Sequence, residues 1–190
     1  MNRSESQGIE IDGICFQTIM QNYQPVIMVN QECKKNDGQV ELGIRITNNT
    51  MTPFRFGKFR IMTPEVIRAD DKVSPLIYLR RRCCYAQERH FALALPGESI
   101  NLFIETKVIN RTYGQREGEL RLSIPFEDGG NNNVDIIKGK KNHFRWIYEN
   151  QNPTHKVGKK SEFSLNQEKT LEDLWVGKVF TPWLELSFSQ

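Results

Sequence analysis

The amino-acid sequence predicts an all-β fold, an antiparallel β-sandwich with at most one short helix. Three observations support this prediction. Apolar and polar residues alternate in seven or more short segments, a period of two that is typical of strands burying one face. Clusters of Gly, Pro, Asn and Ser separate these segments at regular spacing. Helical periodicity is confined to one stretch near the C-terminus.

Alternation is clearest over residues 39–47, where the even positions are apolar. Asn48–Thr50 then has the composition of a turn. The alternation resumes at Phe54, but beyond Gly57 the apolar positions change from even to odd. We therefore expect a β-bulge near Gly57, because one extra residue in a strand produces such a change.

Residues 91–95 and 100–104 also alternate, and Pro-Gly-Glu-Ser lies between them. Proline presets φ for the second position of a turn, and glycine tolerates the positive φ of the third. This stretch therefore predicts a type II turn that joins the two strands of a hairpin. Further strands are expected at residues 9–20, 25–29, 120–124, 144–148 and 184–188.

The length of 190 residues suits a single domain with its own core, expected over residues 9–190. The polar segment 1–8 is expected to be disordered. Residues 127–163 differ in character, because Asn- and Gly-rich turn material leads into a basic stretch. We interpret 127–163 as a hairpin or arm inserted before the last strand. Apolar residues at helical spacing within 164–175 predict the one short helix.

Two stretches resemble bacterial immunoglobulin-like domains. Residues 42–54 resemble the second strand and following turn of these domains, and the Pro-Gly-Glu-Ser turn after residue 95 is similar to one of their common turns. Intracellular proteinase inhibitors of the immunoglobulin-like type share both features. The resemblance covers the middle third of the chain and implies an immunoglobulin-like antiparallel sandwich. It concerns turn geometry, so it implies no activity.

The chain carries neither an apolar targeting region in its first eight residues nor a run of 18 apolar residues. We therefore expect a cytoplasmic protein with no membrane contact. Its net charge of +3 is too small to indicate nucleic-acid binding by itself. In a reducing compartment we expect thiols rather than disulfides at all four cysteines, Cys15, Cys33, Cys83 and Cys84.

No arrangement of residues indicates catalysis. The three histidines have no partner at metal-ligand spacing, and neither a nucleophile elbow nor a phosphate-binding glycine loop occurs. Cys84 and His90 are six residues apart, about 20 Å along a strand, so a nucleophilic pair would need an intervening turn. We predict that the chain is not an enzyme and binds neither a cofactor nor a metal.

Residues 138–160 form the most basic segment, with seven cations and one acid, a net charge of +6. Phe144, Trp146 and Tyr148 are interleaved with these charges. Aromatic rings among cations favour single-stranded nucleic acid, whereas the common parity of the three rings favours one buried strand face. We favour the buried face and keep polyanion binding as an alternative. Its binding residues would be Lys138, Lys140, Lys141, Arg145, Lys156, Lys159 and Lys160.

Two further surfaces are candidates for contact with a partner. Arg80, Arg81 and Arg82 form a second basic spot, where guanidinium groups could pair with carboxylates of another subunit. Trp183 alternates with the apolar positions 184, 186 and 188, so it is expected to face outward. The adjacent Pro182 suits an edge strand, because proline has no backbone N–H to donate. Homodimerisation through this C-terminal strand is therefore a hypothesis.

These observations favour a non-catalytic interaction or structural module whose protein partner is not identified by the sequence. Polyanion or nucleic-acid binding through residues 138–160 is the first alternative. A protease-inhibitor-like domain, in which a loop enters an enzyme cleft, is the second and depends only on the resemblance described above.

Overall fold

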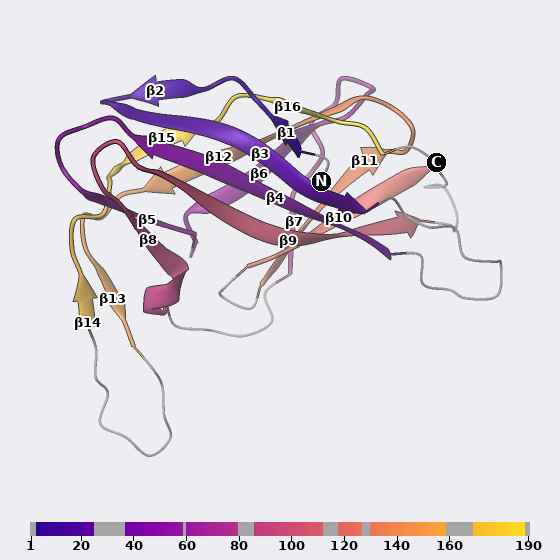
Figure 1. Ribbon diagram of the computed structural model, residues 1–190. Helices are drawn as coiled ribbons and strands as arrows, with labels where there is room; N and C mark the ends of the chain where they lie inside the picture. Colours follow the sequence, from indigo (N-terminus) through magenta and orange to yellow (C-terminus); the bar gives the residue numbers. More distant parts are fainter. Residues whose placement is uncertain are drawn as a thin grey trace, which may run out of the picture.

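The computed structural model describes residues 3–24, 37–58, 60–79, 86–111, 118–126, 130–158 and 169–188 (Figure 1). This part of the chain is all-β, and its strands pair antiparallel in several sheets. One 3₁₀ turn, η1 (Glu88–His90), precedes β8. The prediction of an all-β antiparallel fold is therefore confirmed.

The larger sheet has eight strands in the order β1-β3-β4-β9-β10-β11-β7, with β2 paired to β3. Its longest ladder joins β4 to β9, from the pair Asp37 and Ile109 to the pair Thr47 and Ser99. Its strands are β1 (Arg3–Glu5), β2 (Ile9–Ile11), β3 (Ile14–Gln24), β4 (Asp37–Asn48), β7 (Ile77–Leu79), β9 (Ser99–Arg111), β10 (Glu119–Pro125) and β11 (Asn131–Ile137).

The second sheet is built around β12, which pairs with β6 along one edge and with β15 and then β16 along the other. Two small sheets, β5–β8 and β13–β14, complete the described fold. These strands are β5 (Phe54–Gly57), β6 (Met62–Ile67), β8 (Phe91–Ala94), β12 (Asn142–Asn150), β13 (His155–Val157), β14 (Lys169–Leu171), β15 (Gly177–Phe180) and β16 (Leu184–Leu186).

The core lies between the two main sheets and is centred on aromatic rings. Phe16 of β3 lies 5.7 Å from Tyr148 of β12 and 5.1 Å from Trp175, measured between ring centroids. Phe144 and Trp146 are as fully buried as Tyr148. The alternation of residues 144–148 thus marks the buried face of a strand, which confirms the favoured interpretation of these aromatic residues.

Buried polar groups connect the sheets. The Tyr148 hydroxyl accepts a hydrogen bond from the Gly57 amide at 3.1 Å, and burial raises the pKa of Tyr148. The hydroxyls of Thr18 on β3 and Thr181 beyond β15 lie 2.6 Å apart, and Thr181 also accepts the Trp146 amide at 2.9 Å. These hydrogen bonds join residues of different sheets or of a sheet and a connecting segment, so they help to fix how the sheets are positioned against one another.

The prediction of a hairpin over residues 91–104 is wrong, although the predicted turn between the two strands forms. Gly97 has φ of 79°, and the Glu98 amide donates to the Leu95 carbonyl at 2.9 Å, as a type II turn requires. However, β8 pairs with β5, whereas β9 pairs with β4 and β10. The chain therefore passes from one sheet to another, because alternation identifies the buried face of a strand and not its neighbours.

Two other local expectations are wrong. β5 ends at Gly57 and β6 begins at Met62, so the strand ends at Gly57 and no bulge carries it further. The buried positions of β6, from Met62 to Val66, are again even. The helix expected over 164–175 is replaced, in its described part from residue 169, by β14 and irregular chain; residues 164–168 lie outside the described residues. Leu171, Leu174 and Trp175 are buried there by tertiary contacts rather than along a helical face.

The expected domain boundaries also change. In the segment 1–8, expected to be disordered, Arg3–Glu5 forms β1 and pairs with Ile19–Gln21 of β3. The segment 127–163, interpreted as an insertion, contributes β11 to the interior of the large sheet and β12 to the centre of the second. Over its described residues, 130–158, it is an integral part of both layers and not an added arm.

Candidate functional site

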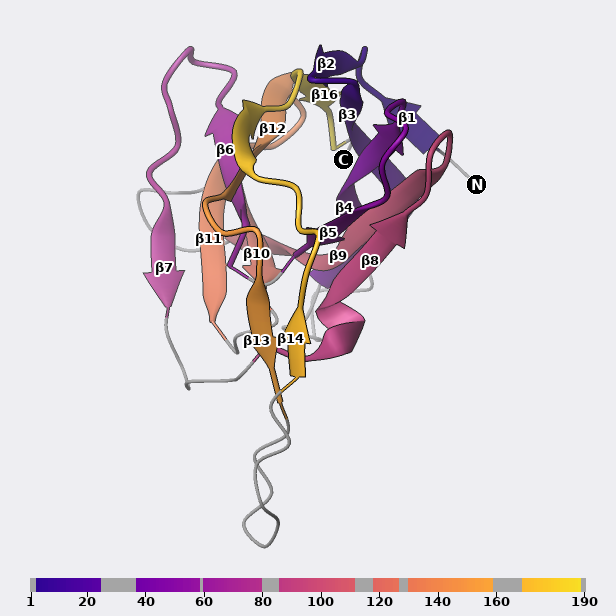
Figure 2. The same cartoon turned by 90° about the vertical axis from the view of Figure 1, so that its left-hand side faces the viewer.

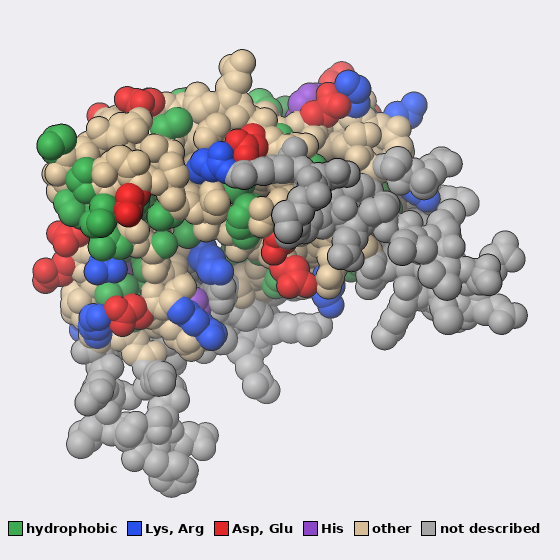
Figure 3. Space-filling view, viewed as in Figure 1, with side chains coloured by type: hydrophobic (Ala, Val, Ile, Leu, Met, Phe, Trp, Pro, Cys, Tyr) green, Lys and Arg blue, Asp and Glu red, His purple; other side chains and the backbone are tan. Residues whose placement is uncertain are grey.

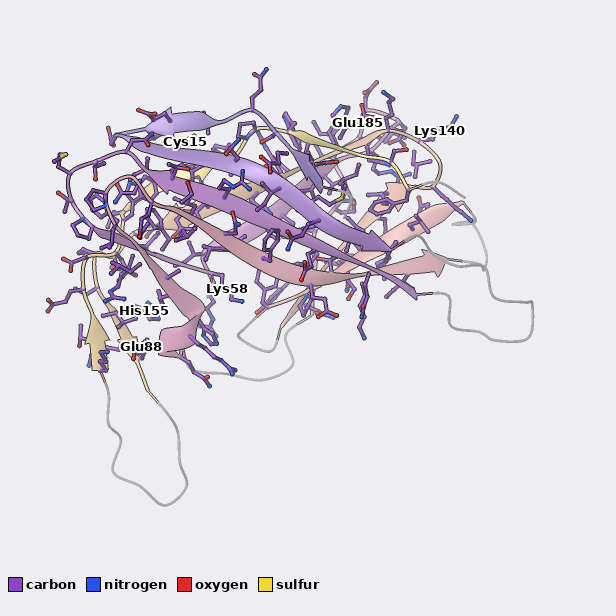
Figure 4. The ribbon with its side chains drawn as sticks, in the orientation of Figure 1. Cys15, Lys58, Glu88, Lys140, His155 and Glu185 are labelled. Atoms are coloured by element: carbon purple, nitrogen blue, oxygen red, sulfur yellow. The ribbon has the colours of Figure 1, made fainter. Side chains whose placement is uncertain are left out.

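The basic residues of segment 138–160 do not lie together where the structure describes them. Lys138, Lys140 and Lys141 lie at the turn between β11 and β12, whereas Lys156 lies on β13, beyond the opposite end of β12. The nine residues of β12 separate these groups by roughly 27 Å. Figure 4 shows this separation through Lys140 and His155, and Figure 3 shows cations scattered among acids on the face it presents.

Two of the expected binding cations are engaged within the chain. Lys141 pairs with Glu185 at 3.0 Å between Nζ and Oε2. Arg145 pairs with Glu65, and its guanidinium lies 4.8 Å from the ring centroid of Phe180 and 4.2 Å from that of Trp183. The interleaved aromatic rings of β12 are buried and cannot stack on bases. Polyanion binding stays a prediction, and residues 80–82, 159 and 160 lie outside the described residues.

The separation of the cations predicts additive effects on heparin binding. Replacing Lys138 and Lys140 by glutamine and, separately, replacing Lys156 by glutamine should each lower the salt concentration of elution from heparin. The variant that combines all three substitutions should lower the elution salt concentration by the sum of the two effects. The two groups are several Debye lengths apart at ordinary ionic strength, so they should act independently. A combined loss clearly larger than that sum would instead indicate one shared polyanion site.

Trp183, the expected interface residue, lies just before β16 and is half-buried. One face of its indole is covered by Arg145, which also contacts the exposed Phe180. β16 pairs with β12 through Leu184–Leu186. The C-terminal strand therefore completes the second sheet, and homodimerisation through it stays a hypothesis.

An open groove lies between β6 and β7, the outermost strand of the large sheet. Figure 2 shows the position of these two strands. The groove has a volume of about 390 Å³. We call it the β7 groove. Its lining residues are Arg60, Met62, Thr63, Leu76, Tyr78, Phe126 and Asn132.

The register between β7 and β11 explains why the groove forms. Tyr78 pairs with Asn132, so their side chains lie on one face of the sheet. The same face of β11 is buried at Val134 and Ile136, but it is open at Tyr78, whose side chain is 47% exposed. The inner face of the sheet therefore continues beyond the core and is accessible at its outer strand.

A second hollow of about 340 Å³ shares Phe126 with the β7 groove. It forms where β9 and β10 diverge, because their ladder ends at the pair Lys107 and Ser123. Its lining is mixed, with aromatic rings beside carboxylates and one ammonium group. The lining residues are Glu41, Lys58, Phe103, Ile104, Glu105, Pro125 and Phe126.

The sequence prediction missed the β7 groove. Leu76–Leu79 is a short apolar run after Pro75, without the alternation used to identify strands. The available signal was the density of large apolar residues from Val73 onward, next to a proline that suits an edge. Its openness depends on which strand lies beside it, which alternation does not report.

His155 predicts a pH dependence of stability. Burial and then the nearby Arg60 lower the pKa of His155. Below about pH 6.5, the ordinary pKa of histidine, the unfolded chain binds a proton more readily than the folded chain, so acidification favours unfolding. His155 therefore contributes stability above this pH, and this contribution is lost as the pH falls through the pKa that His155 has in the folded chain.

Chemical unfolding at pH 7.5 and pH 5.5 measures this effect. The loss of stability between the two values should be smaller in His155→Gln than in the original chain. His143→Gln is the matched control, because it makes the same substitution at a histidine that is exposed on β12. An unchanged pH dependence in His155→Gln would contradict the assignment.

Three observations concern metal-binding and nucleophilic side chains in the described part of the chain. No three of their His, Cys, Asp and Glu side chains gather as metal ligands would. Burial and then Glu10 raise the pKa of Cys15, which disfavours the reactive thiolate. His90 is buried and accepts the Gln87 amide at Nδ1, 3.1 Å away; Cys84 lies outside the described residues.

No helix in the described ranges is both long and apolar enough to cross a membrane. Comparison with known proteins adds no relative: no protein-family model, no curated protein and no solved structure matches the chain. The candidate function therefore depends on the geometry of the surfaces described above.

Proposed function

We propose that the chain is a non-catalytic interaction module, a cytoplasmic domain of the immunoglobulin-like sandwich class, that binds a protein partner through the β7 groove. One observation carries the proposal. Of the ten large apolar side chains exposed in the described residues, four lie between Val73 and Tyr78. Exposed apolar side chains are ordinary when scattered, but their concentration beside a concave surface is typical of interaction sites.

The lining of the groove favours binding over chemistry. Among its described residues, Arg60 is the one charged group, and neither a carboxylate, a histidine nor a cysteine is present. The hydroxyls of Thr63 and Tyr78 also line the groove, but a hydroxyl nucleophile needs an adjacent base, and none of the described lining residues is a carboxylate or a histidine. Apolar and aromatic residues with a single cation instead match the centre of a protein interface, where Met, Tyr, Phe and Arg are enriched.

Site-specific photo-crosslinking tests this proposal. A photo-crosslinking amino acid in place of Leu76 is compared with one in place of Val176, which is exposed to a similar degree, 47% against 42%. Each full chain is irradiated in an extract of the cells that make the protein. We expect a discrete protein adduct from position 76 and none from position 176. Identical patterns from both positions, or no adduct from position 76, would contradict the proposed function.

A further inference from the structure

β7 is the outermost strand of its sheet and has an apolar surface. It pairs with β11 through Ile77–Leu79, and in the described part of the chain no strand pairs with its other edge. Ile77 and Tyr78 are partly exposed, as are Val73 and Leu76 just before the strand. An unpaired strand edge presents backbone N–H and C=O groups that another extended chain can satisfy.

The opposite edge of the same sheet is protected by charge. β1 and β2 both pair with β3 along this edge. Glu5 of β1 forms an ion pair with Arg45 at 2.8 Å, and Glu10 of β2 accepts a hydrogen bond from the Asn49 side chain. Charged residues on an edge strand are a common means of preventing strand addition. The apolar β7 carries no such residue. The two edges of one sheet therefore differ in their capacity to accept another strand.

Within the described residues, the groove beside β7 also contains a buried acceptor without a donor. Asn132 is 6% exposed, and among the described groups its side-chain oxygen has no hydrogen-bond partner. An unsatisfied buried acceptor is costly, on the order of 1–3 kcal/mol, and is uncommon in native proteins. Its neighbour across the ladder, Tyr78, is half-exposed, and both residues line the groove.

We propose that β7 is the docking strand for an extended, mainly apolar peptide segment of the partner that carries an acidic residue. This inference rests on the proposed function and names how the same groove is used. The segment adds to the large sheet beside β7, and backbone hydrogen bonds supply the first part of its recognition. Alternate side chains of the segment then enter the groove, because strand side chains point to opposite faces in turn.

The lining of the groove determines the chemistry of the segment. Leu76, Tyr78 and Phe126 select large apolar side chains at alternate positions. Arg60 already has an interaction within the chain, but its guanidinium has five N–H donors and can also bind a carboxylate of the segment through a charge-assisted hydrogen bond. A side chain of the segment that enters the groove can supply the donor that the Asn132 oxygen lacks; the backbone of the segment cannot, because β7 lies between it and β11. The predicted pattern is thus an alternating apolar segment with one Asp or Glu.

Selection from a phage-displayed library of random dodecapeptides on the full chain tests the inference. Selected peptides are synthesised with a fluorescent label, and their affinity is measured by fluorescence anisotropy. We expect alternating apolar sequences that contain an acid. We also expect at least tenfold weaker binding when alternate backbone amides of the peptide are N-methylated, because methylation removes the donors needed for strand addition. This comparison leaves the protein unchanged.

Variants of the protein locate the binding site. Tyr78→Ser should weaken binding at least tenfold, whereas Phe180→Ser should leave it unchanged, because Phe180 is similarly exposed on the other sheet. Asn132→Leu should weaken binding at least fivefold, because it removes the buried acceptor that a donor of the segment would satisfy. Circular dichroism verifies that each variant is folded.

The outcomes separate this inference from the proposed function. Peptides that bind Tyr78→Ser as well as the original chain, or that tolerate N-methylation, overturn strand addition at β7; a crosslink from position 76 would still support the proposed function. Selection that enriches no peptide overturns the inference as well. If position 76 also gives no adduct, both the inference and the proposed function fail.

Discussion

Replacing Asn142 by alanine is expected to destabilise the fold by about 4 kcal/mol, because it removes several hydrogen bonds to buried backbone groups at once. The Asn142 side chain is fully buried at the start of β12. Its oxygen accepts the amides of Ala69 and Ile137 at 3.2 and 3.0 Å. Its nitrogen donates to the carbonyls of Ile137 and Lys140 at 2.9 and 3.0 Å.

This side chain joins three elements that are distant in sequence. Ala69 follows β6, Ile137 ends β11, and Asn142 begins β12, so one amide fixes the passage of the chain from the large sheet to the second sheet. Alanine leaves backbone donors and acceptors without partners, which costs more than the net value of the bonds themselves.

Urea unfolding measures the effect, and Asn101→Ala is the matched control. Asn101 is exposed on β9 and accepts a hydrogen bond from the Arg45 side chain at 3.1 Å. Its replacement should change stability by less than about 0.5 kcal/mol. A loss below about 1 kcal/mol in Asn142→Ala would show that the turn between β11 and β12 does not depend on this side chain.

Replacing Phe16 by alanine should cost roughly 3–5 kcal/mol, the range for removing a buried phenylalanine. Phe16 is fully buried, and its ring contacts those of Phe56, Tyr148 and Trp175 at centroid distances between 5.1 and 6.2 Å. These partners belong to β5, β12 and the chain before β15, so the cavity would form where the layers meet.

Phe180→Ala is the control for this prediction, because the Phe180 ring is 44% exposed and its removal opens no buried cavity. It should cost less than about 1 kcal/mol, mostly through the lost contact with Arg145. Similar losses in Phe16→Ala and Phe180→Ala would contradict a core shared by the two main sheets.

Local patterns in the sequence were sufficient to predict individual strands. Residues 39–47, 120–124 and 144–148 lie in β4, β10 and β12, and their predicted inward positions are buried. The reason is physical, since alternation follows directly from burial of one strand face. The alternation of residues 144–148 likewise favours a position of the β12 aromatic rings in the core and not on a nucleic-acid surface.

Local sequence patterns do not determine which strands pair with one another. The tight turn before β9 suggested a hairpin, yet β8 and β9 join different sheets. Segment 127–163 was interpreted as an insertion because its loops and charges differ from those of the rest, yet it supplies the central strand of the second sheet. Both outcomes depend on contacts between distant residues, which a local pattern does not contain.

The same distinction applies to the candidate site. The basic residues are close in sequence, but a nine-residue strand separates their described members. Tyr78 and Asn132 are distant in sequence, but the register of β7 and β11 makes them neighbours. Sequence proximity therefore suggested a polyanion surface, whereas strand pairing created the β7 groove.

Hydrogen exchange of the full chain, alone and saturated with the tightest selected peptide, tests docking at β7 most directly. Exchange of an amide slows when a new hydrogen bond or a new contact protects it. We predict slower exchange in residues 73–79 and no change in 138–144 or 177–186. Slower exchange in either of those two segments, with residues 73–79 unchanged, would contradict docking at β7.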